Sequence, residues 1–117
     1  MSKLVISKAV FPKDLNARGT LYGGKLLDWM DELAGIVAAR FSKGDAATVA
    51  IEKMEFLSPI RGGTFLDIEG DVVKVGTTSM EVLVEVWMDC FGNEKSLVAK
   101  AKFIYVALDE NHRPRKF

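Results

Sequence analysis

The stretch NARGTLYGGKLLDWMDELAGIVAAR, residues 16–40, decides the fold because it contains the one long helical pattern of the chain. Turn residues and a Gly-Gly pair come first, and apolar residues then recur at helical spacing over residues 22–41 without an internal proline. A helix of this length spans about 28 Å. Its apolar arc predicts a sheet-facing side made of Leu26, Leu27, Met30, Leu33, Ala34, Val37, Ala38 and Phe41.

The remainder of the chain has the pattern of β-strands. Segments 46–56, 64–75, 78–91 and 96–108 are separated by turn sequences, and residues 4–10 form an earlier strand. Every second residue from Met80 to Cys90 is apolar, which predicts a sheet with one covered face. The helix is the candidate cover, so we expect an α+β fold with one long central helix wrapped by a five-stranded antiparallel sheet. Residues 1–117 are expected to form a single domain.

Composition excludes several classes of protein. The 117 residues include 16 basic and 16 acidic side chains, so no overall charge attracts nucleic acid or an anionic membrane. No run of apolar residues is long enough for a membrane-spanning helix. The single cysteine, Cys90, cannot form an intramolecular disulfide, and the first residues lack the apolar segment of a signal peptide. We therefore expect a cytoplasmic protein without nucleic-acid or membrane partners.

Asp31 lies at the margin of the apolar arc, beside Leu27 and the small residue Gly35. A carboxylate in that position is partly desolvated, which makes it a better base than a free aspartate. Trp29 and Ile36 fall outside the arc, and we expect another subunit to cover them. Each feature alone also has an ordinary explanation, since an aspartate at this margin can simply be solvated and glycines before a helix can simply allow a tight entry.

Four blocks of sequence follow one another along the chain. They are PxxxNxxGxxxGGxxLxxMDExAGxxAAR over residues 12–40, TVAIEKMEFLSPIRGG over residues 48–63, KVGTTSMEVLVEVW over residues 74–87 and FIYVALDENHRPR over residues 103–115. Together they resemble the hotdog-fold acyl-CoA thioesterases, specifically the bacterial short-chain type and the repeats of the eukaryotic cytosolic acyl-CoA hydrolase. The resemblance implies the same helix-in-sheet architecture, a homodimer joined edge to edge, and an assembly of three such dimers into a hexamer.

The resemblance also implies an activity and a set of catalytic residues. The activity is hydrolysis of acyl-CoA to a free fatty acid and coenzyme A, with coenzyme A as part of the substrate, no separate cofactor and no metal. The catalytic carboxylate corresponds to Asp31, the amide that positions water or contacts the carbonyl to Asn16, the oxyanion-binding N–H to Gly23 or Gly24, and a hydroxyl near the attacking water to Thr48. Family precedent puts Asn16 of one subunit beside Asp31 of the other.

These residue types suit thioester hydrolysis. The first N–H groups of a helix lack intrahelical acceptors and carry a partial positive charge, so they can stabilise an oxyanion. Asp31 lies about two turns along the helix from these donors, and we expect one bound thioester to touch both. Whether Asp31 activates water or attacks the thioester directly stays open. The thiolate leaves without a general acid, which agrees with reading the only histidine, His112, as a surface residue.

Coenzyme A carries phosphates, and these need local positive charge or backbone donors. Arg61 lies in the turn after the second predicted strand, and Arg113 and Arg115 lie in the tail. Thr78 and Ser79 follow the Gly76 turn and can offer hydroxyl or backbone donors. We expect these five residues to contact coenzyme A.

Two other functions fit parts of the sequence. A hotdog hydroxyacyl-CoA dehydratase would need an Asp-His pair in its pocket, and the only histidine is at position 112. A non-catalytic acyl-CoA-binding module of the kind found in hotdog transcription factors would carry an added DNA-binding segment. Release of free thiol from acyl-CoA separates a thioesterase from both.

Overall fold

The computed structural model describes residues 3–117, and within them it contains one long helix, one short 3-10 helix and five strands. In chain order these are β1 (Leu4–Ala9), η1 (Pro12–Asp14), α1 (Gly23–Ser42), β2 (Ala46–Phe56), β3 (Phe65–Val75), β4 (Ser79–Met88) and β5 (Ser96–Ala107). The predicted helix and strands are confirmed. The largest difference is at the end of β4, which stops at Met88 because the N–H of Asn93 donates to the Cys90 carbonyl at 2.8 Å and closes a turn.

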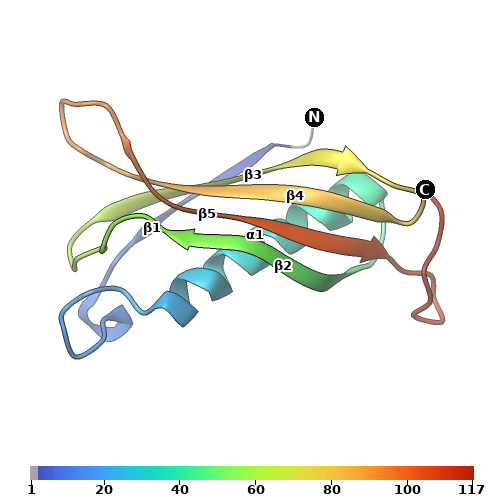
Figure 1. Cartoon of the computed structure of the whole chain (residues 1–117), viewed down its shortest axis with the longest axis horizontal. Coiled ribbons are helices and arrows are strands. Elements are labelled where there is room, and N and C mark those ends of the chain that lie inside the picture. The colour runs from blue at the N-terminus through green and yellow to red at the C-terminus, as the bar shows by residue number, and fades with distance from the viewer. Residues whose placement is uncertain (1–2) are drawn as a thin grey trace.

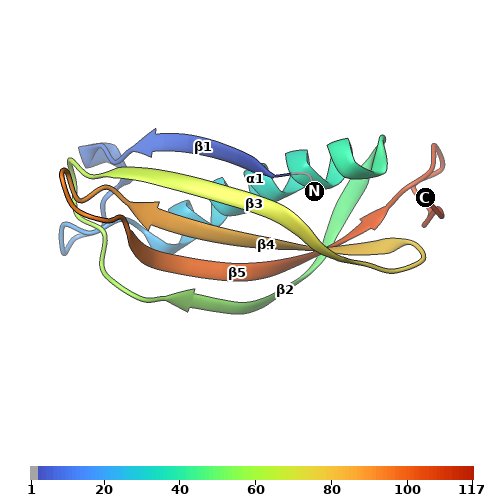
Figure 2. The ribbon, with the colours of Figure 1, turned by 90° about the horizontal axis from the view of Figure 1, so that it is seen from above.

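The strands form one antiparallel sheet in the order β1-β3-β4-β5-β2. Figure 2 shows this order from above, with β1 and β2 at the two edges. The helix α1 runs along one face of the curved sheet, and its first turn lies at the same end of the molecule as the β2–β3 and β4–β5 loops (Figure 1). The expected architecture, a central helix wrapped by a five-stranded antiparallel sheet, is confirmed.

The core lies between α1 and the inner face of the sheet. Six residues of the predicted helix arc are buried, and the other two, Leu27 and Phe41, are partly buried against the core. Gly70 of β3 lies directly under the helix, because a Cβ at this position would be 2.5 Å from Cδ2 of Leu33. The missing side chain lets the helix approach the sheet closely. This contact helps to set the distance between α1 and the sheet.

The expectation that another subunit covers Trp29 is wrong. Its side chain is buried within the chain itself, and the Lys8 ammonium of β1 lies 4.8 Å from the centre of a Trp29 ring. The helical pattern predicts the direction in which Trp29 points, but the curvature of the sheet decides what is there, and β1 curls around to that side. Ile36 is exposed in the protomer, and its burial by another subunit stays a prediction.

The edge strand β2 carries apolar side chains that remain accessible to solvent. Val49 is 58% exposed, Ile51 is 40% exposed and Phe56 is 56% exposed. The outer edge of β2 also has no strand beside it within the described residues. An exposed apolar edge strand is a surface on which another strand can pair.

Candidate active site

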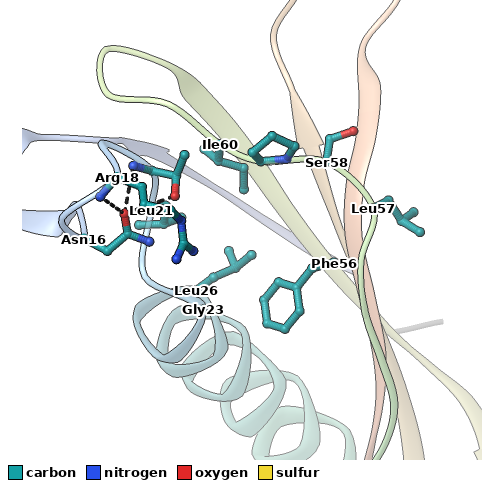
Figure 3. Close-up of a pocket in the computed structure, with 11 residues that line it drawn as sticks. Asn16, Arg18, Leu21, Gly23, Leu26, Phe56, Leu57, Ser58 and Ile60 are labelled. Carbon is teal, nitrogen blue, oxygen red and sulfur yellow. Dashed lines mark hydrogen bonds between the residues drawn. The ribbon is translucent and has the colours of Figure 1, made fainter.

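A cavity of about 350 Å³ opens at the N-terminal end of α1 (Figure 3). Three segments form its wall: the loop before the helix, the first turn of the helix, and the end of β2 with the loop that follows. The lining residues are Asn16, Arg18, Thr20, Leu21, Gly23, Leu26, Phe56, Leu57, Ser58, Pro59 and Ile60. The N–H of Leu21 donates to the Ile60 carbonyl at 2.7 Å, so a backbone hydrogen bond fixes the two loops to each other.

Asn16 is held in the wall of this cavity by its own loop. Its side-chain oxygen accepts hydrogen bonds from the N–H of Arg18 at 2.9 Å and from the N–H and hydroxyl of Thr20, both at 3.2 Å. Because the oxygen is hydrogen-bonded within the loop, the amide nitrogen points away from these loop donors, as Figure 3 shows. The predicted site residue therefore presents a hydrogen-bond donor, with its orientation already fixed.

The start of α1 provides further donors at the same cavity. The helix begins at Gly23, Tyr22 at the N-cap makes no side-chain capping hydrogen bond, and no acidic residue lies in the first turn. The first N–H groups of an α-helix have no intrahelical acceptor and carry a partial positive charge. Gly23 lines the cavity, and Gly24, the next residue, is exposed. The cavity thus has an uncapped helix terminus in its wall, which suits an anionic oxygen.

Asp31 lies elsewhere in the same chain, where α1 faces β2 and β5. Its Oδ1 accepts hydrogen bonds from the Thr48 hydroxyl at 2.9 Å and from the Tyr105 hydroxyl at 2.6 Å. Asp31 is not among the residues that line the cavity. It lies eight positions after Gly23 in the continuous helix, which corresponds to an axial distance of about 12 Å. One thioester carbonyl cannot contact two points this far apart, so the expectation that one bound thioester touches both stays a prediction, and it requires Asp31 from a second subunit.

Sequence reasoning did not single out Tyr105, which lies on β5 and is buried. Burial raises the pKa of the Tyr105 hydroxyl, and its hydrogen bond to Asp31 raises that pKa further. The hydroxyl therefore remains a proton donor throughout the neutral range. A tyrosine on the inward face of a strand pattern is itself a signal, because its hydroxyl needs a polar partner when buried.

The residues expected to contact coenzyme A are divided between the two ends of the molecule. Arg61 pairs with Thr20 in an isolated β-bridge, which puts it beside the cavity. Thr78 is at the other end, where its carbonyl accepts the Ala107 N–H at 2.9 Å, and Ser79 follows it. Arg113 and Arg115 follow Ala107 in the tail, so they lie at the same end as Thr78.

Arg115 is engaged with the protein, whereas Arg113 is exposed. The Arg115 guanidinium donates from Nε to the Leu108 carbonyl at 2.9 Å and from Nη2 to the Ser42 carbonyl at 3.0 Å. Ser42 is the last residue of α1, where carbonyl groups lack intrahelical donors and favour a cation. Arg115 therefore fixes the tail to the C-terminal end of the helix.

The part of the chain that the structure describes contains no group of three or more His, Cys, Asp or Glu side chains arranged to hold a metal ion. His112 lies in the turn of the tail and is exposed, in agreement with its interpretation as a surface residue. Over the same residues, no helix is both long enough and apolar enough to cross a membrane.

Comparison with known proteins shows what this chain is similar to. Residues 18–89 match the family model described as the thioesterase superfamily. A Bacillus subtilis protein described as the uncharacterized acyl-CoA thioester hydrolase YkhA is 40% identical over 97% of this chain and 66% of its own length. Among solved structures, an acyl-CoA hydrolase from Staphylococcus aureus in complex with butyryl coenzyme A and coenzyme A superposes with a TM-score of 0.95, at 35% identity over 98% of this chain and 71% of that one.

Another solved structure, the hexameric thioesterase y2039 from Yersinia pestis, has a TM-score of 0.89 at 30% identity and covers 96% of this chain and 92% of its own. Further structures of the Staphylococcus aureus enzyme are of mutants in which one asparagine, one threonine or one aspartate is replaced by alanine. These are the three residue types that are found here at positions 16, 48 and 31.

Proposed function

The chain belongs to the thioesterase superfamily, among the hotdog-fold acyl-CoA thioester hydrolases, and on that premise we propose that it hydrolyses acyl-CoA at sites shared between two subunits. In each site Asp31 of one subunit acts on the thioester that is held in the cavity of the other. Asn16 and the helix N-terminus at Gly23 and Gly24 bind the carbonyl oxygen. Thr48 orients Asp31 and lies close enough to contact the attacking water.

One observation supports this proposal: the cavity and the Thr48–Asp31 pair lie at opposite ends of the same edge strand. Phe56, the last residue of β2, lines the cavity, whereas Thr48, near the start of β2, is hydrogen-bonded to Asp31. When two copies of an edge strand pair antiparallel about a two-fold axis, residues are matched in reverse order. Pairing two β2 strands therefore brings the Thr48 end of one subunit beside the Phe56 end of the other. This removes the separation of about 12 Å that exists within one protomer.

Relatives and surface chemistry support such an assembly. Thioesterases with this fold are described as hexamers, and an assembly of three dimers would have that size. The exposed Val49 and Ile51 of β2 also give the free edge an apolar character that favours burial against a second copy. We therefore propose a dimer joined through β2, three of which form a hexamer.

The chemistry follows from this arrangement. As a general base, Asp31 takes a proton from water while the water oxygen attacks the thioester carbon, and the carbonyl oxygen becomes an oxyanion at the helix N-terminus. Collapse of this intermediate breaks the carbon–sulfur bond and releases the fatty acid and the coenzyme A thiolate. As a nucleophile, Asp31 instead forms a mixed anhydride that water then hydrolyses. An oxyanion donor of this kind contributes roughly 3 kcal/mol to the stability of the transition state.

In the proposed dimer, the basic and hydroxyl residues near the cavity suit the phosphates of coenzyme A. Arg61 lies beside the cavity of its own subunit, because it pairs with Thr20 of the cavity wall. In an antiparallel dimer, the end of the partner that carries Thr78, Ser79, Arg113 and Arg115 lies on the same side as this cavity. The phosphates would thus meet basic residues of both subunits.

The test is release of free thiol from acyl-CoA substrates ranging from acetyl- to palmitoyl-CoA. Wild-type protein should release coenzyme A, and Asp31→Asn, which keeps the size of the side chain, should lose at least ~10²-fold in kcat. Binding of acyl-CoA without thiol release would instead indicate an acyl-CoA-binding module. Equal rates for the two proteins would exclude Asp31 from the chemistry.

A further inference from the structure

Tyr105 reaches Asp31 from inside the sheet. It lies on β5, the strand next to the edge strand β2 (Figure 2), and only 3% of its surface is exposed. Its hydroxyl oxygen is 2.6 Å from Asp31 Oδ1 and 2.9 Å from the backbone carbonyl of Asp31. Both of these contacts are with Asp31, and the Thr48 side chain is a further hydrogen-bond partner of the phenol.

The single phenolic proton is directed to the carboxylate. A hydroxyl can donate only one hydrogen bond, and an ionised acceptor attracts it more strongly than a neutral carbonyl does. The 2.6 Å separation lies in the range of charge-assisted O–H···O⁻ bonds, which are shorter and stronger than bonds between neutral groups. Burial keeps the phenol protonated, because it raises the pKa of Tyr105.

Both hydroxyl donors bind the same carboxylate oxygen. Tyr105 of β5 and Thr48 of β2 converge on Oδ1 of Asp31. Over residues 3–117, no donor is hydrogen-bonded to Oδ2. The two strands therefore fix the plane of the carboxylate and leave one defined oxygen free.

Gly35 leaves room beside the helix for the Tyr105 hydroxyl. It lies one helical turn after Asp31, and a Cβ at this position would be 3.3 Å from the Tyr105 hydroxyl oxygen. An alanine at this position would require the Tyr105 hydroxyl to move by a few tenths of an ångström. The sequence therefore combines a tyrosine and a glycine that together allow the contact with Asp31.

We propose that Tyr105 is a positioning residue that holds Asp31 through Oδ1 and leaves Oδ2 as the oxygen that acts on water or on the thioester. This inference rests on the proposed function of Asp31. Tyr105 does not line the cavity, so its effect is on the orientation of the reacting group. Reactions of this kind are sensitive to misplacement of the reacting group by fractions of an ångström. The expected effect is therefore on kcat, with KM preserved.

The test compares Tyr105→Phe, Asp31→Asn and the double variant in the thiol-release assay, with thermal unfolding of each. Tyr105→Phe removes one hydroxyl, and we expect kcat to fall roughly tenfold while KM stays within about twofold. In the Asp31→Asn background the same substitution should have no further effect on the residual rate. A structural role would lower the rate by the same factor in both backgrounds, and a double-mutant cycle distinguishes the two cases.

Gly35→Ala is the second variant, and it separates positioning from stability. Alanine favours a helix over glycine by up to ~1 kcal/mol, which offsets part of the cost of displacing the phenol. We therefore expect a lower kcat with little change in the temperature of thermal unfolding. An unchanged or higher kcat in Tyr105→Phe, together with an inactive Asp31→Asn, would overturn the role of Tyr105 and leave the proposed function intact. Full activity of Asp31→Asn would overturn the proposed function itself.

Discussion

Mixing two inactive variants should restore activity if each site is shared between subunits. The perturbation is a pair of single changes in separate proteins: Asn16→Ala in one and Asp31→Asn in the other. In one chain, Asn16 lies at the cavity and Asp31 about 12 Å along the helix from its first residue. Each variant is therefore expected to be inactive alone, because every site of its homodimer lacks one of the two side chains.

The size of the recovery follows from the symmetry of the dimer. After subunits exchange in an equal mixture, half of the dimers contain one copy of each variant. Such a dimer has one site with both defects and one site with neither. Half of the dimers with half of their sites intact gives about a quarter of the wild-type activity.

The assay is thiol release from acyl-CoA after the two proteins are mixed at equal concentration, diluted until the dimers dissociate, and reconcentrated. Each variant treated alone in the same way is the control for refolding and for contaminating activity. Thermal unfolding of Asn16→Ala checks that the loss of its three loop hydrogen bonds has not unfolded the protein. A mixture no more active than the mean of its parents, with subunit exchange verified by differently tagged chains, would refute a shared site.

Three further predictions concern the fold, the assembly and the buried phenol. Gly70→Ala places a methyl 2.5 Å from Leu33 and should lower the free energy of unfolding by about 1–3 kcal/mol, measured by denaturant titration; an unchanged midpoint would mean that the helix can move away freely. Val49→Lys, on the edge strand, should weaken the affinity of the dimer at least ~tenfold in sedimentation equilibrium. The control Val73→Lys replaces a similarly exposed valine on β3 and should leave that affinity unchanged. Equal masses for the two variants would exclude dimerisation through β2. Because burial raises the pKa of Tyr105 above its ordinary value of 10.0, the unfolded chain loses this proton first as the pH rises. The free energy of unfolding of wild type should therefore fall above about pH 10 by up to ~1.4 kcal/mol per pH unit relative to Tyr105→Phe, and parallel curves would contradict this.

The fold could be predicted from the sequence because its signals are local. The spacing of apolar residues gave the helix that begins at Gly23 and the strand β4 with its buried alternate residues. The environment of Trp29 could not be predicted in this way. A helical pattern gives an angle around the axis, and whether a strand lies at that angle depends on the twist of the whole sheet.

The candidate site was predictable in part for the same reason. Asn16, Gly23 and Asp31 occur close together in one segment with a recognisable spacing. Tyr105 is 74 residues away from Asp31 in sequence, and only the pairing of β5 with its neighbours brings the two together. Alternation along β5 does predict that Tyr105 points inward, and a buried hydroxyl requires a partner. The identity of that partner depends on the register of strands and helix, which a single sequence does not specify.

The division of the site has a consequence for how activity depends on assembly. Among the described residues, no carboxylate lines the cavity at Gly23, and Asp31 lies outside that lining. If the site is shared between subunits as proposed, a lone protomer should therefore be inactive. Formation of the proposed dimer would both bury the apolar edge of β2 and complete the site. On this proposal the stability of the interface and the catalytic activity depend on the same contact, so a substitution that weakens β2 pairing should lower activity even when it touches no substrate.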